Sequence, residues 1–225
     1  QAFAFLGPTG ASAPVVTPTS GHHPVAVTGL PSGEFVMFAD YLTEARVWRF
    51  DAAGAQIGAW ARIGGRMYLR NAVAQHDGTS LNALVHYSFA ARQYIRLFRG
   101  DRYQYSYTLS DIPEAMSGTS NSPRGAAGVG MFIEDGELLV VYAHYLGNAE
   151  ETAALYLLRY ELPPTPNLAP ILLSGPTRIT DSTYQAWVPR IVRQGSRFFG
   201  GFRDGSADPA NDVYTFTGTL PDCSY

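Results

Sequence analysis

Four glycines in short polar turns set the phase of this sequence: Gly33, Gly78, Gly136 and Gly195. Each turn separates two runs in which apolar residues recur at every second position, a pattern typical of β-strands. The runs before the turns cover residues 24–30, 71–75, 126–133 and 188–193, and the runs after them cover residues 34–41, 81–87, 137–145 and 197–203. A unit that recurs in this way predicts a repeat architecture and therefore constrains the fold more than any other feature.

Further runs extend these units. A third run, rich in aromatic residues, covers residues 47–50, 94–98, 155–160 and 213–216, and a fourth covers residues 57–62, 103–109 and 170–179. The last unit lacks a fourth run. No stretch of the sequence sustains an apolar stripe at helical spacing, so we expect an all-β chain.

The N-terminal segment Ala2-Phe3-Ala4-Phe5-Leu6 reads as a strand without a unit of its own, and residues 7–20 read as a linker rich in Pro, Thr and Ser. If residues 2–6 complete the last unit, the array closes into a ring without an unpaired edge, as radial β-repeats do. The sequence therefore predicts a single domain over residues 1–225, a four-bladed β-propeller. Its approximate blades are residues 21–65, 66–118, 119–180 and 181–225, with residues 2–6 as the closing strand.

In size and architecture this repeat resembles hemopexin-like domains, although the paired cysteines of many such domains are missing. A β-sandwich and a fragment of a larger propeller are the alternative folds.

Composition excludes several classes of protein. Cys223 is the single cysteine, so neither an intrachain disulfide nor a cysteine zinc cluster can form. A formal net charge of −3 argues against a nucleic-acid binder. Apolar runs such as 138–143 are far too short to span a membrane. No basic leader segment precedes the repeats, as in a mature chain after cleavage or in a protein that is not secreted. Of these two we expect the first, an extracellular or periplasmic protein.

Polar residues collect where the first strand of each unit begins and where the second strand ends, positions that share one face of a propeller. The first-strand positions are His22, His23, Arg70, Arg124 and Arg190. The second-strand positions are Asp40, Tyr41, His86, Tyr87, His144, Tyr145, Arg203 and Asp204.

Three arginines at matching points of three units favour an anionic ligand, because a guanidinium fork can bind a carboxylate in a bidentate manner. We expect Arg70, Arg124 and Arg190 to bind an acidic glycan. Further ligand-binding candidates on the same face are Arg203, Asp40 and Trp187, the last by stacking on a sugar ring. Alternatively, each arginine pairs with a carboxylate of the next blade or caps a strand end.

Two His-Tyr pairs suggest proton transfer, because imidazole titrates near neutral pH. With an arginine to neutralise a uronic acid, His86, Tyr87, His144 and Tyr145 are the catalytic candidates of a polysaccharide lyase. However, adjacent residues on a strand point to opposite faces, so one member of each pair packs into the sheet interface. If the histidine is that member, it is a core residue.

Other functions remain open. A hydrolase needs two carboxylates, for which Asp40, Asp204, Glu150 and Glu151 are available. A non-catalytic, lectin-like glycan binder or a protein-interaction module would use the same face. No organic cofactor is expected, and His22, His86 and His144 lack the spacing of a metal site. Asp204, Asp208 and Asp212 lie in a loop that could bind structural Ca²⁺, although an ordinary solvated loop is the simpler interpretation.

Overall fold

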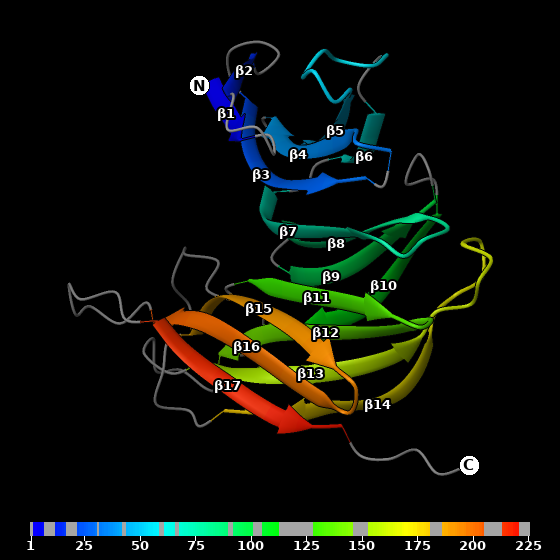
Figure 1. The fold of residues 1–225 in the computed structure, drawn as a ribbon. Helices are drawn as coiled ribbons and strands as arrows, with labels where there is room; N and C mark the ends of the chain where they lie inside the picture. Colours follow the sequence, from blue (N-terminus) through cyan, green and yellow to red (C-terminus); the bar gives the residue numbers. More distant parts are fainter. Residues whose placement is uncertain are drawn as a thin grey trace.

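The computed structural model describes residues 2–6, 12–16, 22–30, 32–41, 44–58, 61–65, 68–89, 92–100, 105–112, 128–145, 153–180, 186–204 and 213–220. All regular elements in these ranges are β-strands, and they form four antiparallel sheets and one two-stranded hairpin (Figure 1). This confirms the predicted all-β class. The described part of the chain holds no helix of the length and hydropathy that crossing a membrane requires.

Each sheet contains strands that follow one another in the chain. The first sheet contains β3 (His22–Gly29), β4 (Phe35–Tyr41), β5 (Glu44–Phe50) and β6 (Ala61–Gly65). The second contains β7 (Tyr68–His76), β8 (Leu81–Phe89), β9 (Arg92–Arg99) and β10 (Tyr105–Ile112). The third contains β11 (Val129–Glu134), β12 (Glu137–Tyr145), β13 (Ala153–Glu161) and β14 (Ile171–Arg178). The fourth contains β15 (Ala186–Gln194), β16 (Arg197–Asp204) and β17 (Val213–Thr219).

The four glycines singled out in the sequence lie in turns, and all four have positive φ angles. The turn between β11 and β12 shows the reason most clearly. Asp135 and Gly136 have φ angles of 51° and 75°, and two successive residues with positive φ give a hairpin turn whose twist matches that of the strands.

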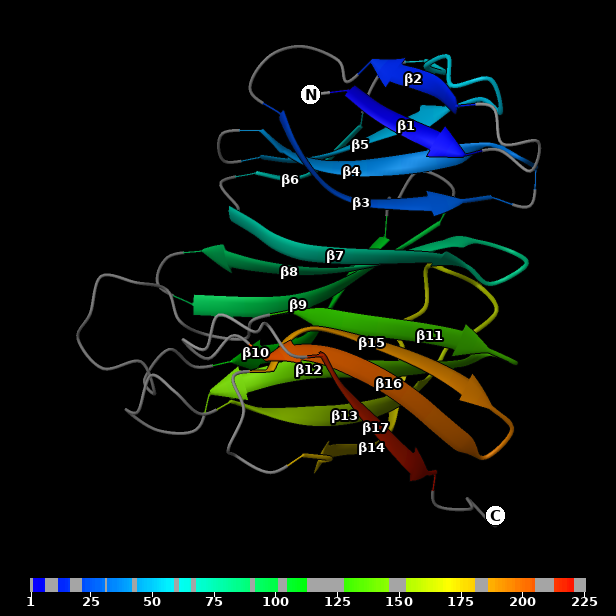
Figure 2. The same ribbon diagram turned by 60° about the vertical axis from the view of Figure 1, so that its left-hand side comes forward.

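The four sheets stand side by side, with their first strands adjacent: β3 contacts β7, β7 contacts β11, and β11 contacts β15 (Figure 2). Apolar side chains fill the space between successive sheets. Val36, Phe38 and Val85 belong to the cluster between the first two sheets, and Phe198 and Phe216 to the cluster between the last two. The alternation read from the sequence therefore reflects sheets that are packed against neighbouring sheets.

The N-terminal strand is placed differently from our prediction. β1 (Ala2–Leu6) pairs with β2 (Ser12–Val16), and the sheet of β15, β16 and β17 has three strands. A hairpin with a short connection closes a much smaller loop than pairing with β17, about 200 residues away, and its entropic cost is lower. Residues 12–16, which we read as linker, are thus a strand, and closure of a four-bladed ring remains a prediction.

Candidate functional site

One end of each sheet gathers the polar positions singled out in the sequence. We call it the proximal end, where β3, β7, β11 and β15 begin and β4, β8, β12 and β16 end; the opposite end is the distal end. Strand register brings these positions together across each pair: His23 lies opposite Asp40, Leu69 opposite Tyr87, and Trp187 opposite Arg203. The first strands are neighbours, so the proximal ends of the four sheets lie on one side of the molecule.

A one-residue bulge recurs near the proximal end of three first strands. The register shifts between Pro24 and Ala26 in β3, between Leu69 and Asn71 in β7, and between Trp187 and Arg190 in β15. Bulges are common beside functional sites because they redirect side chains. In β7 the extra residue is Arg70 itself, and in β15 the bulge directly precedes Arg190.

Arg190 has the best-defined side chain among the predicted ligand-binding residues. Its Nη1 donates to the carbonyl oxygens of Val129, at 3.3 Å, and Pro189, at 3.1 Å. The residue as a whole is exposed, but desolvation of its guanidinium lowers the pKa from the ordinary value. An arginine nevertheless remains charged at neutral pH.

The position of this guanidinium follows from the pairing of β11. Ala143 N donates to Gly128 O, so even-numbered residues of β11 bond to β12 and the backbone of Val129 and Ile133 faces away from it. Arg190 therefore lies on the inner edge of the third sheet. Gln75 bonds the same edge at its distal end, donating to Ile133 O at 2.7 Å and accepting from Ile133 N at 2.9 Å. Side chains of both neighbouring sheets thus cap the open backbone of β11.

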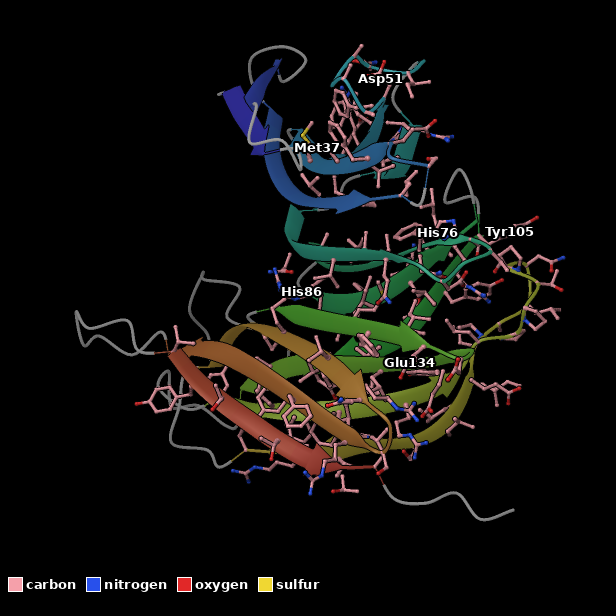
Figure 3. The ribbon with its side chains drawn as sticks, in the orientation of Figure 1. Met37, Asp51, His76, His86, Tyr105 and Glu134 are labelled. Carbon is pink, nitrogen blue, oxygen red and sulfur yellow. The ribbon has the colours of Figure 1, made fainter. Side chains whose placement is uncertain are left out.

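His86 lies in the core. Its exposed fraction is 1%, and it stands opposite Asn71 in the strand register (Figure 3). This burial favours the core-histidine interpretation over a role in proton transfer.

The partner position holds a residue that sequence reasoning missed. Within the described part of the chain, Oδ1 of Asn71 is a buried acceptor without a hydrogen-bond partner. A buried unsatisfied acceptor calls for an explanation such as a water or a ligand, and its place beside the bulge makes Asn71 a further candidate residue. The signal in the sequence was the amide side chain of Asn71, which directly follows the predicted ligand-binding residue Arg70.

The remaining predicted residues are placed through their backbone. Proximal strand segments contain Arg70, Asp40, Tyr87, His144, Tyr145, Trp187, Arg203 and Asp204. Outside the described residues lie Arg124, Glu150, Glu151, Asp208 and Asp212. The described structure thus brings the strands of most candidates to one end, and the catalytic assignments remain predictions.

The first two strands of each sheet supply few carboxylates at this end. The described first strands hold one acidic residue, Glu134, which lies at the distal end with His76, away from His86 (Figure 3). Asp40 and Asp204, at the ends of β4 and β16, are the proximal carboxylates that the described second strands supply. In the ranges that the structure describes, no three His, Cys, Asp or Glu side chains gather into a metal-binding group.

Distal charges are paired and serve the packing of the sheets. Glu137 accepts from Arg159 Nε at 2.6 Å and from Arg193 Nη1, which joins the third sheet to the fourth. Burial raises the pKa of Glu137, but hydrogen bonds from these two arginines outweigh it and leave the pKa below its ordinary value.

A second distal network is centred on Asp77. Burial raises the pKa of Asp77, but hydrogen bonds from Ser80, Thr79 and Asn82 bring it down to about 2. Arg99, with an exposed fraction of 1%, donates to Asn82 Oδ1 at 3.1 Å and to Pro163 O at 2.8 Å. These groups hold turns and sheets together and leave the proximal end as the candidate site.

Comparison with known proteins finds similarity in fold alone. No protein-family model matches the chain, and no curated protein sequence matches it. Solved structures do match, and among them are glycoside hydrolases of families 43 and 32, whose fold is a five-bladed β-propeller.

Two of these structures illustrate the match. The α-L-arabinanase of Penicillium chrysogenum, complexed with arabinobiose, superposes with a TM-score of 0.55 at 12% identity, over 92% of this chain and 67% of the arabinanase. An endo-1,4-β-xylanase of Bacteroides thetaiotaomicron gives a TM-score of 0.54 at 11% identity, over 89% of this chain and 72% of the xylanase.

A third structure gives a similar match. The sucrose-6-phosphate hydrolase of Lactobacillus gasseri gives a TM-score of 0.51 at 8% identity, over 92% of this chain and 48% of the hydrolase. The sheets of this chain therefore resemble propeller blades of glycoside hydrolases. The number of blades remains a prediction. The sequence also allowed a fragment of a larger propeller, and this alternative accords with neighbours that have five blades.

Proposed function

We propose that this chain is a carbohydrate-binding β-propeller that holds a carboxylated glycan at the proximal end of its sheets. The placement of Arg190 carries this proposal. Two backbone carbonyls fix its Nη1, while no hydrogen bond of its Nε or Nη2 occurs within the described residues. Hydrogen-bond donors held in a fixed direction are suited to binding a carboxylate. The fold shared with glycan-active enzymes supports a sugar that carries this carboxylate.

Matched polysaccharides test the binding step. A polyuronate and a neutral xylan are titrated with the purified protein, and the two affinities are compared by calorimetry. We expect tighter binding of the polyuronate and a weakening of about tenfold on Arg190→Lys, which keeps the charge and removes the fork. Arg197→Lys, at the distal end of the same sheet, is the matched control. Equal affinities in wild type and Arg190→Lys would contradict the proposal.

Hydrolysis of the bound glycan is a second candidate function, because the structural neighbours are glycoside hydrolases. Asp40 and Asp204 are its candidate carboxylates, one as acid and one as base or nucleophile. New reducing ends that appear with the wild type, and are lost with both Asp40→Asn and Asp204→Asn, would assign this activity.

Polyuronate elimination is the other chemical outcome, with Tyr87, His144 and Tyr145 as the acid and base candidates. Its readout is the ultraviolet absorbance of unsaturated products. Saturable binding without reducing ends or absorbance would identify a lectin-like module. An extracellular or periplasmic location is part of the same proposal, since polymeric glycans of this kind lie outside the cytoplasm.

A further inference from the structure

The fourth sheet ends in an open strand edge. In the first three sheets the third strand pairs with a fourth, as β13 does with β14. In the fourth sheet β17 occupies the position of β13, and within the described residues it pairs with β16 alone. In the part of the chain that the structure describes, one of its two edges is therefore unpaired.

The hydrogen-bond pattern shows which backbone groups this edge presents. Leu220 N donates to Ser196 O at 2.7 Å, so in β17 the even-numbered residues, Phe216 among them, bond to β16. The N–H and C=O groups of Thr215 and Thr217 consequently point away from the sheet.

The third sheet shows how such groups are used. Leu162 N donates to Gly136 O at 2.7 Å, in the same position as the bond from Leu220. The outward groups of β13 then bond to the outer strand and its continuation, as Leu155 O does with Ile179 N at 2.9 Å. The outward edge of β17 is thus built like one that accepts a strand.

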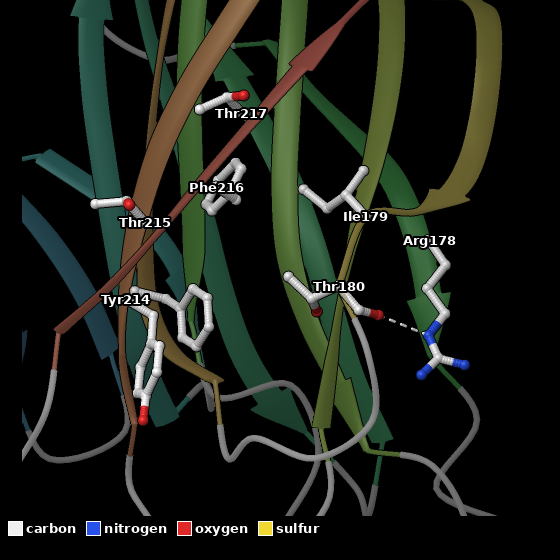
Figure 4. A pocket seen from close by; sticks show the side chains of 8 residues that line it. Arg178, Ile179, Thr180, Tyr214, Thr215, Phe216 and Thr217 are labelled. Atoms are coloured by element: carbon white, nitrogen blue, oxygen red, sulfur yellow. Dashed lines mark hydrogen bonds between the residues drawn. The ribbon is translucent and has the colours of Figure 1, made fainter.

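A pocket of about 570 Å³ lies along this edge (Figure 4). Phe202, Tyr214 and Phe216 line it with aromatic rings, and residues 178–180 at the end of β14 form its other side. The rings of Phe202 and Tyr214 stack with centroids 5.6 Å apart, and Thr215 and Thr217 lie beside them, so the lining combines aromatic and polar groups. A strand added to β17 would place every second side chain toward this lining.

The same chain carries a second open edge. β1 pairs with β2 on one side, and no other strand joins this hairpin in the described part of the chain. Its sequence alternates small and aromatic residues, Ala2-Phe3-Ala4-Phe5. The hairpin and β17 lie at opposite ends of the row of sheets, so the two open edges of one molecule do not face each other (Figures 1 and 2).

We propose that the open edge of β17 accepts β1 of a second copy of this chain. Antiparallel or parallel pairing would extend the fourth sheet by the hairpin, and one row of aromatic side chains would enter the pocket. Two different surfaces meet in such a contact, so the association is head-to-tail and forms closed rings or chains of molecules. Edges that are neither short, charged nor covered are prone to this pairing.

Thr217→Pro tests the edge. Proline removes an N–H that points away from β16 and leaves the bonds of the neighbouring residues in place. Sedimentation velocity over a concentration series should show self-association of the wild type and its loss in Thr217→Pro. Thr217→Val, which keeps the N–H, should associate like the wild type. A wild type that stays monomeric at every concentration, or equal association of both variants, would overturn the proposal.

A second set of measurements identifies the occupant and does not depend on the proline variant. The 225-residue chain with Phe3→Glu and Phe5→Glu should no longer associate, and a peptide of residues 1–7 should dissociate the wild-type assembly. Hydrogen exchange of residues 213–219 should slow on association. Association that persists in the glutamate variant, or unchanged exchange in residues 213–219, would show that another surface holds the copies together and would refute the assignment.

Discussion

Gly130 of β11 lies against the backbone of β15, and its replacement by alanine tests this packing of the third and fourth sheets. A Cβ atom at this position would lie 2.7 Å from Pro189 O and 2.8 Å from Val141 Cγ1. Both distances are below van der Waals contact. Val141 is fully buried, and the Pro189 oxygen is backbone, so β15 must move relative to β11.

Overpacking of this kind costs about 1–3 kcal/mol. The smaller unfolded-state entropy of alanine offsets about 0.4–1 kcal/mol of it. We therefore expect Gly130→Ala to lower the free energy of unfolding by about 1–2 kcal/mol in urea titrations, with an unchanged m-value. The Pro189 carbonyl also accepts from Arg190, so polyuronate affinity should fall with stability.

Gly29→Ala is the matched control for Gly130→Ala. No atom lies within 4 Å of the Cβ that it would add in β3, so its stability should stay within about 0.5 kcal/mol of the wild type or rise slightly. Equal stability of Gly130→Ala and Gly29→Ala would contradict the idea that the close approach of β11 and β15 positions the fourth sheet.

Three further substitutions test the distal network and the capping of β11. The pKa of Asp77 is lowered from 3.8 to about 2, so its contribution is present above pH 4 and is lost as pH falls toward 2. Wild type should lose about 2 kcal/mol over that interval, and Asp77→Asn should not; equal slopes in acid titrations would contradict this. Gln75→Leu should cost about 1–3 kcal/mol in urea, because it leaves both backbone groups of Ile133 unbonded, whereas exposed Gln194→Leu should cost nothing measurable. Glu137→Gln should cost about 3 kcal/mol by the same assay, since it leaves two partly buried guanidiniums uncompensated, and a neutral effect would show that the pairs are dispensable.

Sequence reasoning succeeded where the determinants are local. The turn at Asp135 and Gly136 needs residues that tolerate positive φ, and the runs on either side alternate because each sheet is packed against neighbours. These features fix four strand units and the end of each unit where polar residues collect. Adjacent His and Tyr residues also predicted that one member of a pair such as His86 and Tyr87 would be buried.

Only the tertiary structure decided that His86 is a buried residue and what lies opposite it. The bulge at Arg70 shifts the register of β7 against β8, so His86 stands opposite Asn71, and its exposed fraction is 1%. Arg190 bonds the carbonyl of Val129, 61 residues away in the sequence, which periodicity within one strand cannot reveal.

The pairing of the N-terminal strand shows the same division. Alternation identified residues 2–6 as a strand, and the structure confirmed it. Two partners were available to this strand: the nearby segment β2 and the distant edge of β17. It pairs with β2 because closing the short connection loses less chain entropy. Local sequence thus determined the repeated units, whereas the cost and geometry of long-range contacts determined how strands, side chains and edges meet.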